Sequence, residues 1–153
     1  MFPLRQVASI GLALTLAIAA AEPGVKAQFA GGTIAGIASK CGARLDLTGK
    51  ENLHFKCGDV ELAIPYRKVN TLEYGLNVGR RYAAAVLISP VFLLSKSKRH
   101  FVTLGYVDAE GIQQALVIRI EKGDIRSVLT GLEARTGRRV EYQDSEARKA
   151  GKG

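Results

Sequence analysis

Histidine and cysteine are scarce in this 153-residue chain, which has two of each and no tryptophan. His54 and His100 have no second histidine at the spacing of metal ligands, and two cysteines alone are too few for a zinc site. No serine has the flanking glycines of a nucleophile elbow, and the glycine-rich segments 31–36 and 42–51 lack the spacing of nucleotide-binding loops. We therefore expect no catalytic residue, no metal and no cofactor, and nothing in the sequence argues for an enzyme.

The sequence also lacks an apolar run of the about 20 residues that a helix needs to cross a bilayer. Its longest run, residues 7–21, follows a basic amino-terminal region that contains Arg5. Small residues precede two candidate cleavage positions, after Ala21 and after Ala27, as in a secretory signal peptide. We predict a signal peptide over residues 1–27, with the second position favoured, and export to the bacterial periplasm or cell envelope. An uncleaved membrane anchor is the alternative.

The two cysteines fit an oxidising compartment. Residues 41–47 and 51–57 alternate between apolar and polar side chains, which is typical of two strands of a hairpin with one buried face. A register that pairs Leu45 with Leu53 places Cys41 opposite Cys57 on the apolar side, within disulfide reach. We predict a Cys41–Cys57 disulfide, and two buried free thiols are the alternative.

Further strand patterns occupy residues 60–64, 69–74, 100–107 and 112–120. The period then changes to that of a helix near 124–136, and its apolar stripe consists of Ile125, Val128, Leu129 and Leu132. Such a stripe must pack on the apolar face of the sheet. The predicted fold class is therefore α+β, mainly β: a curved antiparallel sheet or small barrel of about 6–8 strands, closed by one C-terminal amphipathic helix.

The composition of the rest of the chain predicts its domain boundaries. Residues 28–40 are rich in glycine and alanine with weak periodicity, so we expect a flexible lead-in. Residues 41–142 are expected to form a single β-rich domain. The polar residues 143–153 are expected to be a disordered tail.

Two features of the sequence carry a resemblance to known families. The segment IPYRKVNTLEYG, followed by GRR, SKSKRHFVTLGY and LEARTGRRVEY, resembles a group of uncharacterised exported bacterial proteins. Four strands, an apolar stretch, two further strands and a closing helix resemble the pleckstrin-homology-like (GRAM-like) architecture. The resemblance covers residues 43–142. It implies a binding or scaffolding module, and it implies no particular ligand.

The chain has 22 basic and 14 acidic residues, a formal net charge of +8, which favours anionic partners. Five of the cations flank an uncharged segment, residues 82–94, that Pro90 interrupts: Arg80, Arg81, Lys96, Lys98 and Arg99. This segment has three interpretations. It can be two buried strands, a surface for a protein partner, or a loop that contacts a membrane through Val91, Phe92, Leu93 and Leu94.

Two functions follow from these patterns. The first is a non-catalytic envelope module that docks on an anionic membrane or an acidic protein through the five flanking cations. The alternative is a periplasmic small-ligand carrier or enzyme with a pocket under the C-terminal helix. Nucleic acid is not expected as a partner, because the basic residues are not interleaved with aromatic residues that stack on bases.

Overall fold

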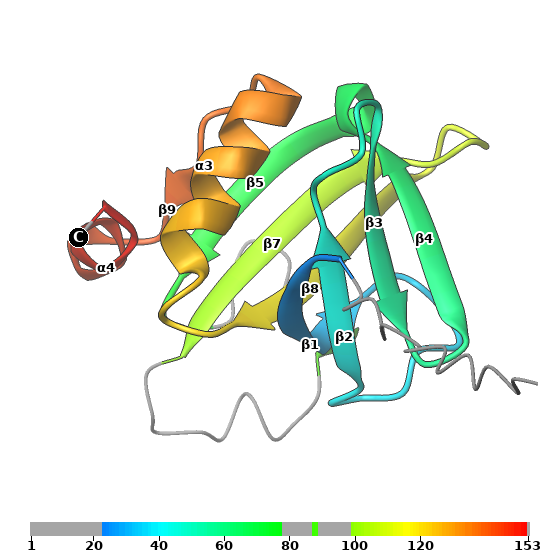
Figure 1. The fold of residues 1–153 in the computed structure, drawn as a ribbon, viewed down its shortest axis with the longest axis horizontal. Coiled ribbons are helices and arrows are strands. Elements are labelled where there is room, and N and C mark those ends of the chain that lie inside the picture. The colour runs from blue at the N-terminus through cyan, green and yellow to red at the C-terminus, as the bar shows by residue number, and fades with distance from the viewer. Residues whose placement is uncertain (1–22, 78–86, 89–98, 153) are drawn as a thin grey trace, which may run out of the picture.

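The computed structural model describes residues 23–77, 87–88 and 99–152 (Figure 1). This part of the chain forms one nine-stranded sheet with two α-helices and one short 3-10 helix. The strands are β1 (Val25–Gly32), β2 (Gly42–Asp46), β3 (Asn52–Cys57), β4 (Val60–Pro65), β5 (Val69–Gly75), β6 (Leu87–Ile88), β7 (His100–Val107), β8 (Gln113–Ile120) and β9 (Glu141–Tyr142). The helices are η1 (Tyr66–Lys68), α3 (Ile125–Thr136) and α4 (Ser145–Lys152). The predicted α+β, mainly β class is confirmed.

The sheet is an open path of strands in the order β4-β3-β2-β1-β8-β7-β5-β9, and β6 pairs separately with β1. Neighbouring strands are antiparallel except for β5 and β9, which are parallel. The prediction of an antiparallel sheet is therefore right for most of the path and wrong at the β9 edge. Because β4 and β9 are the two ends of the path, the described strands do not close into a barrel.

Strand β1 lies at the centre of the sheet. Its first half pairs with β2, from Val25↔Leu45 to Gln28↔Gly42, and it pairs with β8 from Ala27 onward. A register shift between Phe29 and Gly31 bends the strand between these neighbours. The predicted flexible lead-in, 28–40, is therefore wrong at its start, because residues 28–32 belong to β1. The predicted domain, 41–142, is also too short at this end.

Helix α3 matches its prediction. The four stripe residues are all buried: Ile125, Val128, Leu129 and Leu132. They join one core with apolar side chains from both halves of the sheet, including Leu45, Phe55, Leu72, Leu104 and Leu116. Gly137 ends the helix in the left-handed conformation, with φ 69°, and its amide donates a hydrogen bond to the carbonyl of Glu133.

A second helix, α4, replaces the disordered tail that was predicted for residues 143–153. The Ala147 amide donates a hydrogen bond to Asp144 Oδ1 over 2.7 Å, which caps the first turn. Ala147 and Gly151 are buried where the helix contacts the sheet. A Cβ atom on Gly151 would lie 2.7 Å from a ring carbon of Tyr142, so only glycine permits this close approach. The small residues dock α4, and the prediction of disorder is wrong for 145–152.

The predicted Cys41–Cys57 disulfide is confirmed, with a Cα–Cα distance of 6.0 Å. The predicted register is wrong by two residues in sum, because Ala43 pairs with Cys57 and Leu45 with Phe55. Cys41 therefore lies diagonally across from Cys57, just before β2 begins. A diagonal pair on one face of a sheet is still close enough for the bridge.

Candidate anion-binding site

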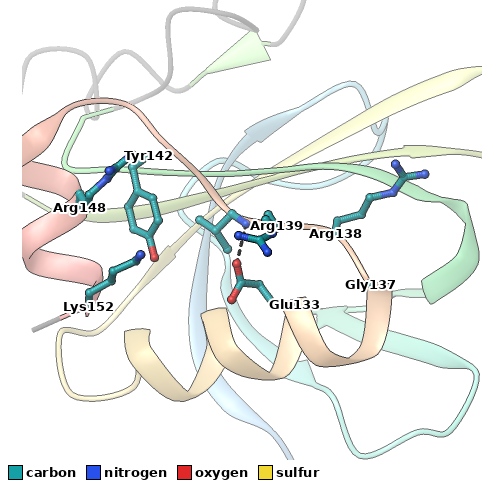
Figure 2. Close-up of a pocket in the computed structure, with 8 residues that line it drawn as sticks. Glu133, Gly137, Arg138, Arg139, Tyr142, Arg148 and Lys152 are labelled. Atoms are coloured by element: carbon teal, nitrogen blue, oxygen red, sulfur yellow. Dashed lines mark hydrogen bonds between the residues drawn. The ribbon is translucent and has the colours of Figure 1, made fainter.

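A pocket of about 580 Å³ lies beside the C-terminal end of α3 (Figure 2). Its walls are α3, the connection to β9, β9 itself and α4. The residues that line it are Glu133, Gly137, Arg138, Arg139, Val140, Tyr142, Arg148 and Lys152. We call this the α4 pocket.

The turn after α3 positions one wall of the α4 pocket. Gly137 reverses the chain, and the Arg138 amide then donates a hydrogen bond to Thr136 Oγ1 over 3.1 Å. The Val140 amide donates to Glu133 Oε1 over 2.8 Å, while the Val140 side chain is buried in the core. These contacts fix the backbone on both sides of Arg138 and Arg139. The two arginine side chains remain exposed at the mouth of the pocket.

Helix α4 supplies the opposite wall. Arg148 and Lys152 are four residues apart and therefore lie on one face of the helix. The Arg148 guanidinium carbon lies 5.9 Å from the centroid of the Tyr142 ring, and Lys152 Nζ lies 5.7 Å from it. These are cation–π distances. Figure 2 shows both side chains extending from α4 beside the tyrosine.

The α4 pocket is strongly cationic. Arg138, Arg139, Arg148 and Lys152 are opposed by a single carboxylate, Glu133, so the formal charge of the lining is +3. Within the described part of the chain none of these four cations forms a salt bridge. The Glu133 carboxylate already accepts the Val140 amide. Four positive groups and one carboxylate leave the lining with an excess of positive charge, which can attract an anion.

The Tyr142 hydroxyl remains neutral in this setting. Burial raises the pKa of Tyr142, the nearby Glu133 raises it further, and Arg148 acts in the opposite direction. The phenol can therefore donate a hydrogen bond to an anion at neutral pH.

The buried Tyr74 and the half-buried His100 form a pair on the sheet beside α4. The Tyr74 hydroxyl is hydrogen-bonded to His100 Nδ1, and the two rings stack with centroids 6.0 Å apart. Burial raises the pKa of Tyr74 to about 12. Burial and, next, the charge of Lys122 lower the pKa of His100. This hydrogen bond links β5 to β7.

The structure locates only part of the site that the sequence analysis proposed. Most of its members lie outside the described residues: Arg80, Arg81, Lys96, Lys98, Val91, Phe92, Leu93 and Leu94. Arg99 is described, and its amide donates to the carbonyl of Leu76 over 3.2 Å. Leu87 and Ile88 pair with Gly32 and Gly31 as strand β6, as expected if this part of the apolar segment is a strand. None of the described helices has the length and apolar character to cross a membrane.

The residues of the α4 pocket were not selected from the sequence. A sequence signal for α4 exists, because Asp144 can cap a helix and Ala147 and Gly151 lie four residues apart. The pairing of α4 with Tyr142 and Tyr74 depends on tertiary packing. Among the described residues, no three histidine, cysteine, aspartate or glutamate side chains are grouped so that they could hold a metal ion.

No family model matches the chain, and no curated protein or solved structure is similar to it at a significant level.

Proposed function

We propose that this protein is a non-catalytic binding module that recognises an anionic partner through the α4 pocket. One observation carries the proposal: four cations line one pocket, and the only carboxylate of the lining is hydrogen-bonded to a backbone amide. The interaction is electrostatic, so it weakens as salt screens the charges.

We propose in addition that the fold is pleckstrin-homology-like. Support comes from the strand order, in which β1 to β4 are consecutive antiparallel neighbours and β5, β7 and β8 form a second antiparallel set. The register shift in β1 lies where that strand passes from β2 to β8. A helix, α3, follows the second set, and β9 and α4 extend the arrangement.

We propose that the protein is exported, and that cleavage occurs after Ala21. The disulfide is compatible with an oxidising compartment. Cleavage after Ala27 would remove Val25, Lys26 and Ala27, which pair with Leu45, Arg44 and Ala43 of β2. The intact mass of the protein recovered from the cell envelope is expected to correspond to a chain that begins at Glu22. A chain that begins at Gln28, or one that retains Met1, contradicts this boundary.

The anion-binding proposal predicts a specific effect of charge removal. The double variant Arg148→Ser and Lys152→Ser is expected to bind a fluorescent tetraglutamate peptide about tenfold more weakly, because each exposed cation contributes up to about 1 kcal/mol. The measurement is fluorescence anisotropy of the peptide with the purified mature protein at low salt, repeated at high salt.

Two further variants make this measurement specific. Arg126→Ser with Lys149→Ser removes the same charge from exposed positions outside the pocket, and its affinity is expected to change less than about twofold. Arg138→Ser with Arg139→Ser removes charge from the opposite wall without altering α4, and is expected to reproduce the tenfold loss. Equal losses in the control and in the two pocket variants contradict a localised site.

A further inference from the structure

A second basic pocket, of about 420 Å³, lies on the other flank of the C-terminal end of α3. Its lining residues are Lys50, Glu51, Asn52, Pro65, Tyr66, Arg67, Arg135 and Thr136. We call this the η1 pocket. Three cations and one carboxylate give it a formal charge of +2.

Arg135 has a structural role in the η1 pocket. Its Nη1 donates a hydrogen bond to the carbonyl of Gly49 over 2.8 Å, and its guanidinium lies 5.7 Å from the centroid of the Tyr66 ring. The Tyr66 hydroxyl in turn donates to the carbonyl of Leu47 over 3.1 Å. Lys50 and Arg67 are both exposed. These two cations are therefore available to a ligand, while Arg135 links α3 to Gly49 and Tyr66.

The two pockets meet at the end of α3. Thr136 lines the η1 pocket and the next residue, Gly137, lines the α4 pocket. Helix α3 contacts both η1 and α4, and Figure 1 shows its C-terminal end between η1 and β9. In Figure 2 the Arg138 side chain extends away from Tyr142, so it is not confined to the wall that faces α4. The lining of the two pockets together comprises seven cations and two carboxylates.

We infer that the anionic partner is an acidic polypeptide segment that crosses the end of α3 and contacts both pockets. This inference rests on the proposed function of the α4 pocket. It names the partner as a chain of aspartate and glutamate side chains, and it adds the η1 pocket as a second contact site.

The chemistry of the surface favours a polypeptide over other polyanions. Five of the seven cations are arginines, whose planar guanidinium groups match carboxylates in a two-point geometry. The aromatic rings at the two pockets, Tyr66 and Tyr142, already contact cations, so they are not free platforms for bases. A path that bends over a helix end also suits a flexible chain better than a flat bilayer.

The length of the ligand provides the test. A helix with its side chains is about 10–12 Å across. A tetraglutamate peptide spans at most about 14 Å, so it can fill one pocket, whereas a dodecaglutamate peptide can extend to about 40 Å and reach both. When one ligand reaches two sites, the second contact is intramolecular and raises the apparent affinity.

We expect dodecaglutamate to bind the mature protein about 100-fold more tightly than tetraglutamate at low salt. About tenfold of this ratio arises because the longer peptide offers more positions to a single pocket. In the double variant Lys50→Ser and Arg67→Ser the ratio is therefore expected to fall to about tenfold. Arg126→Ser with Lys149→Ser serves as the control of equal charge and is expected to keep the full ratio.

Each remaining outcome overturns a specific part of the inference. A ratio that is unchanged in Lys50→Ser with Arg67→Ser shows that only the α4 pocket binds, which rejects the two-pocket path and leaves the proposed function intact. Tighter binding to polyphosphate or to phosphatidylglycerol vesicles than to dodecaglutamate rejects a polypeptide partner. Absence of binding to both peptides and to both other probes rejects the proposed function itself.

Discussion

Reduction of the Cys41–Cys57 disulfide is expected to lower the free energy of unfolding by about 3 kcal/mol. The two cysteines are 16 residues apart in the sequence, so the bridge closes a short loop that contains the turn between β2 and β3. In the chain-entropy model a loop of this size restricts the unfolded chain by that amount. Cys57 is also buried in the core, with 3% of its surface exposed.

The measurement is urea denaturation followed by circular dichroism, with and without a thiol reductant. The double variant Cys41→Ala with Cys57→Ala is the control, because its unfolding midpoint is expected to be low and insensitive to the reductant. An oxidised protein with the same midpoint as the reduced protein would show that the bridge does not stabilise the fold.

Substitution of Leu132 by alanine is expected to destabilise the protein by about 2–5 kcal/mol. Leu132 has 0% of its surface exposed and is one of the four residues that pack α3 against the sheet. Alanine removes several buried carbons and leaves a cavity that close packing on both sides prevents from collapsing. Thr130→Ala, on the exposed side of the same helix, is the matched control and is expected to change stability by less than about 0.5 kcal/mol.

The same variant has a consequence for binding. Helix α3 carries Glu133 and Arg135, and its C-terminal end separates the two basic pockets. A ligand that binds only the folded protein stabilises it by mass action. Dodecaglutamate is therefore expected to raise the thermal midpoint of Leu132→Ala and of the unaltered protein alike. A Leu132→Ala protein as stable as Thr130→Ala would contradict the position of α3 in the core.

The elements that the sequence predicts well are those with a strong local pattern. Period-two alternation around Cys41 and Cys57 is sufficient to predict the hairpin and its bridge, although the register differs. The stripe from Ile125 to Leu132 is sufficient to predict α3, because four apolar residues at helical spacing must be buried together. Gly137 then ends the helix, because glycine readily adopts the left-handed conformation.

Strand β1 was missed because its sequence gives little local indication of a strand. It includes Ala27, Ala30, Gly31 and Gly32, and small residues have low β propensity. Its stability comes from its central position, where β2 and β8 pair with it on its two sides. Glycine permits the close approach of β1 to β8, since a Cβ atom on Gly32 would lie 2.6 Å from the carbonyl oxygen of Ala115.

Helix α4 and the α4 pocket were missed for a related reason. An eight-residue helix is marginal by itself, and α4 is stabilised by packing against Tyr74 and Tyr142. Arg138 and Arg139 precede β9, whereas Arg148 and Lys152 follow it. Only the fold of the chain around Tyr142 brings these four cations to one pocket. The net positive charge of the sequence indicates an anionic partner. The position of the binding site cannot be predicted without the tertiary structure.

The most direct test of the anion-binding proposal is a nuclear magnetic resonance titration of the mature, isotope-labelled protein with dodecaglutamate. We expect saturable shifts of the backbone amide signals on both walls of the α4 pocket, from Gly137 to Val140 and from Arg148 to Lys152, and high salt should abolish them. Signals that move only in β2, β3 and β4, or that do not move at all, would contradict an anion site between α3 and α4.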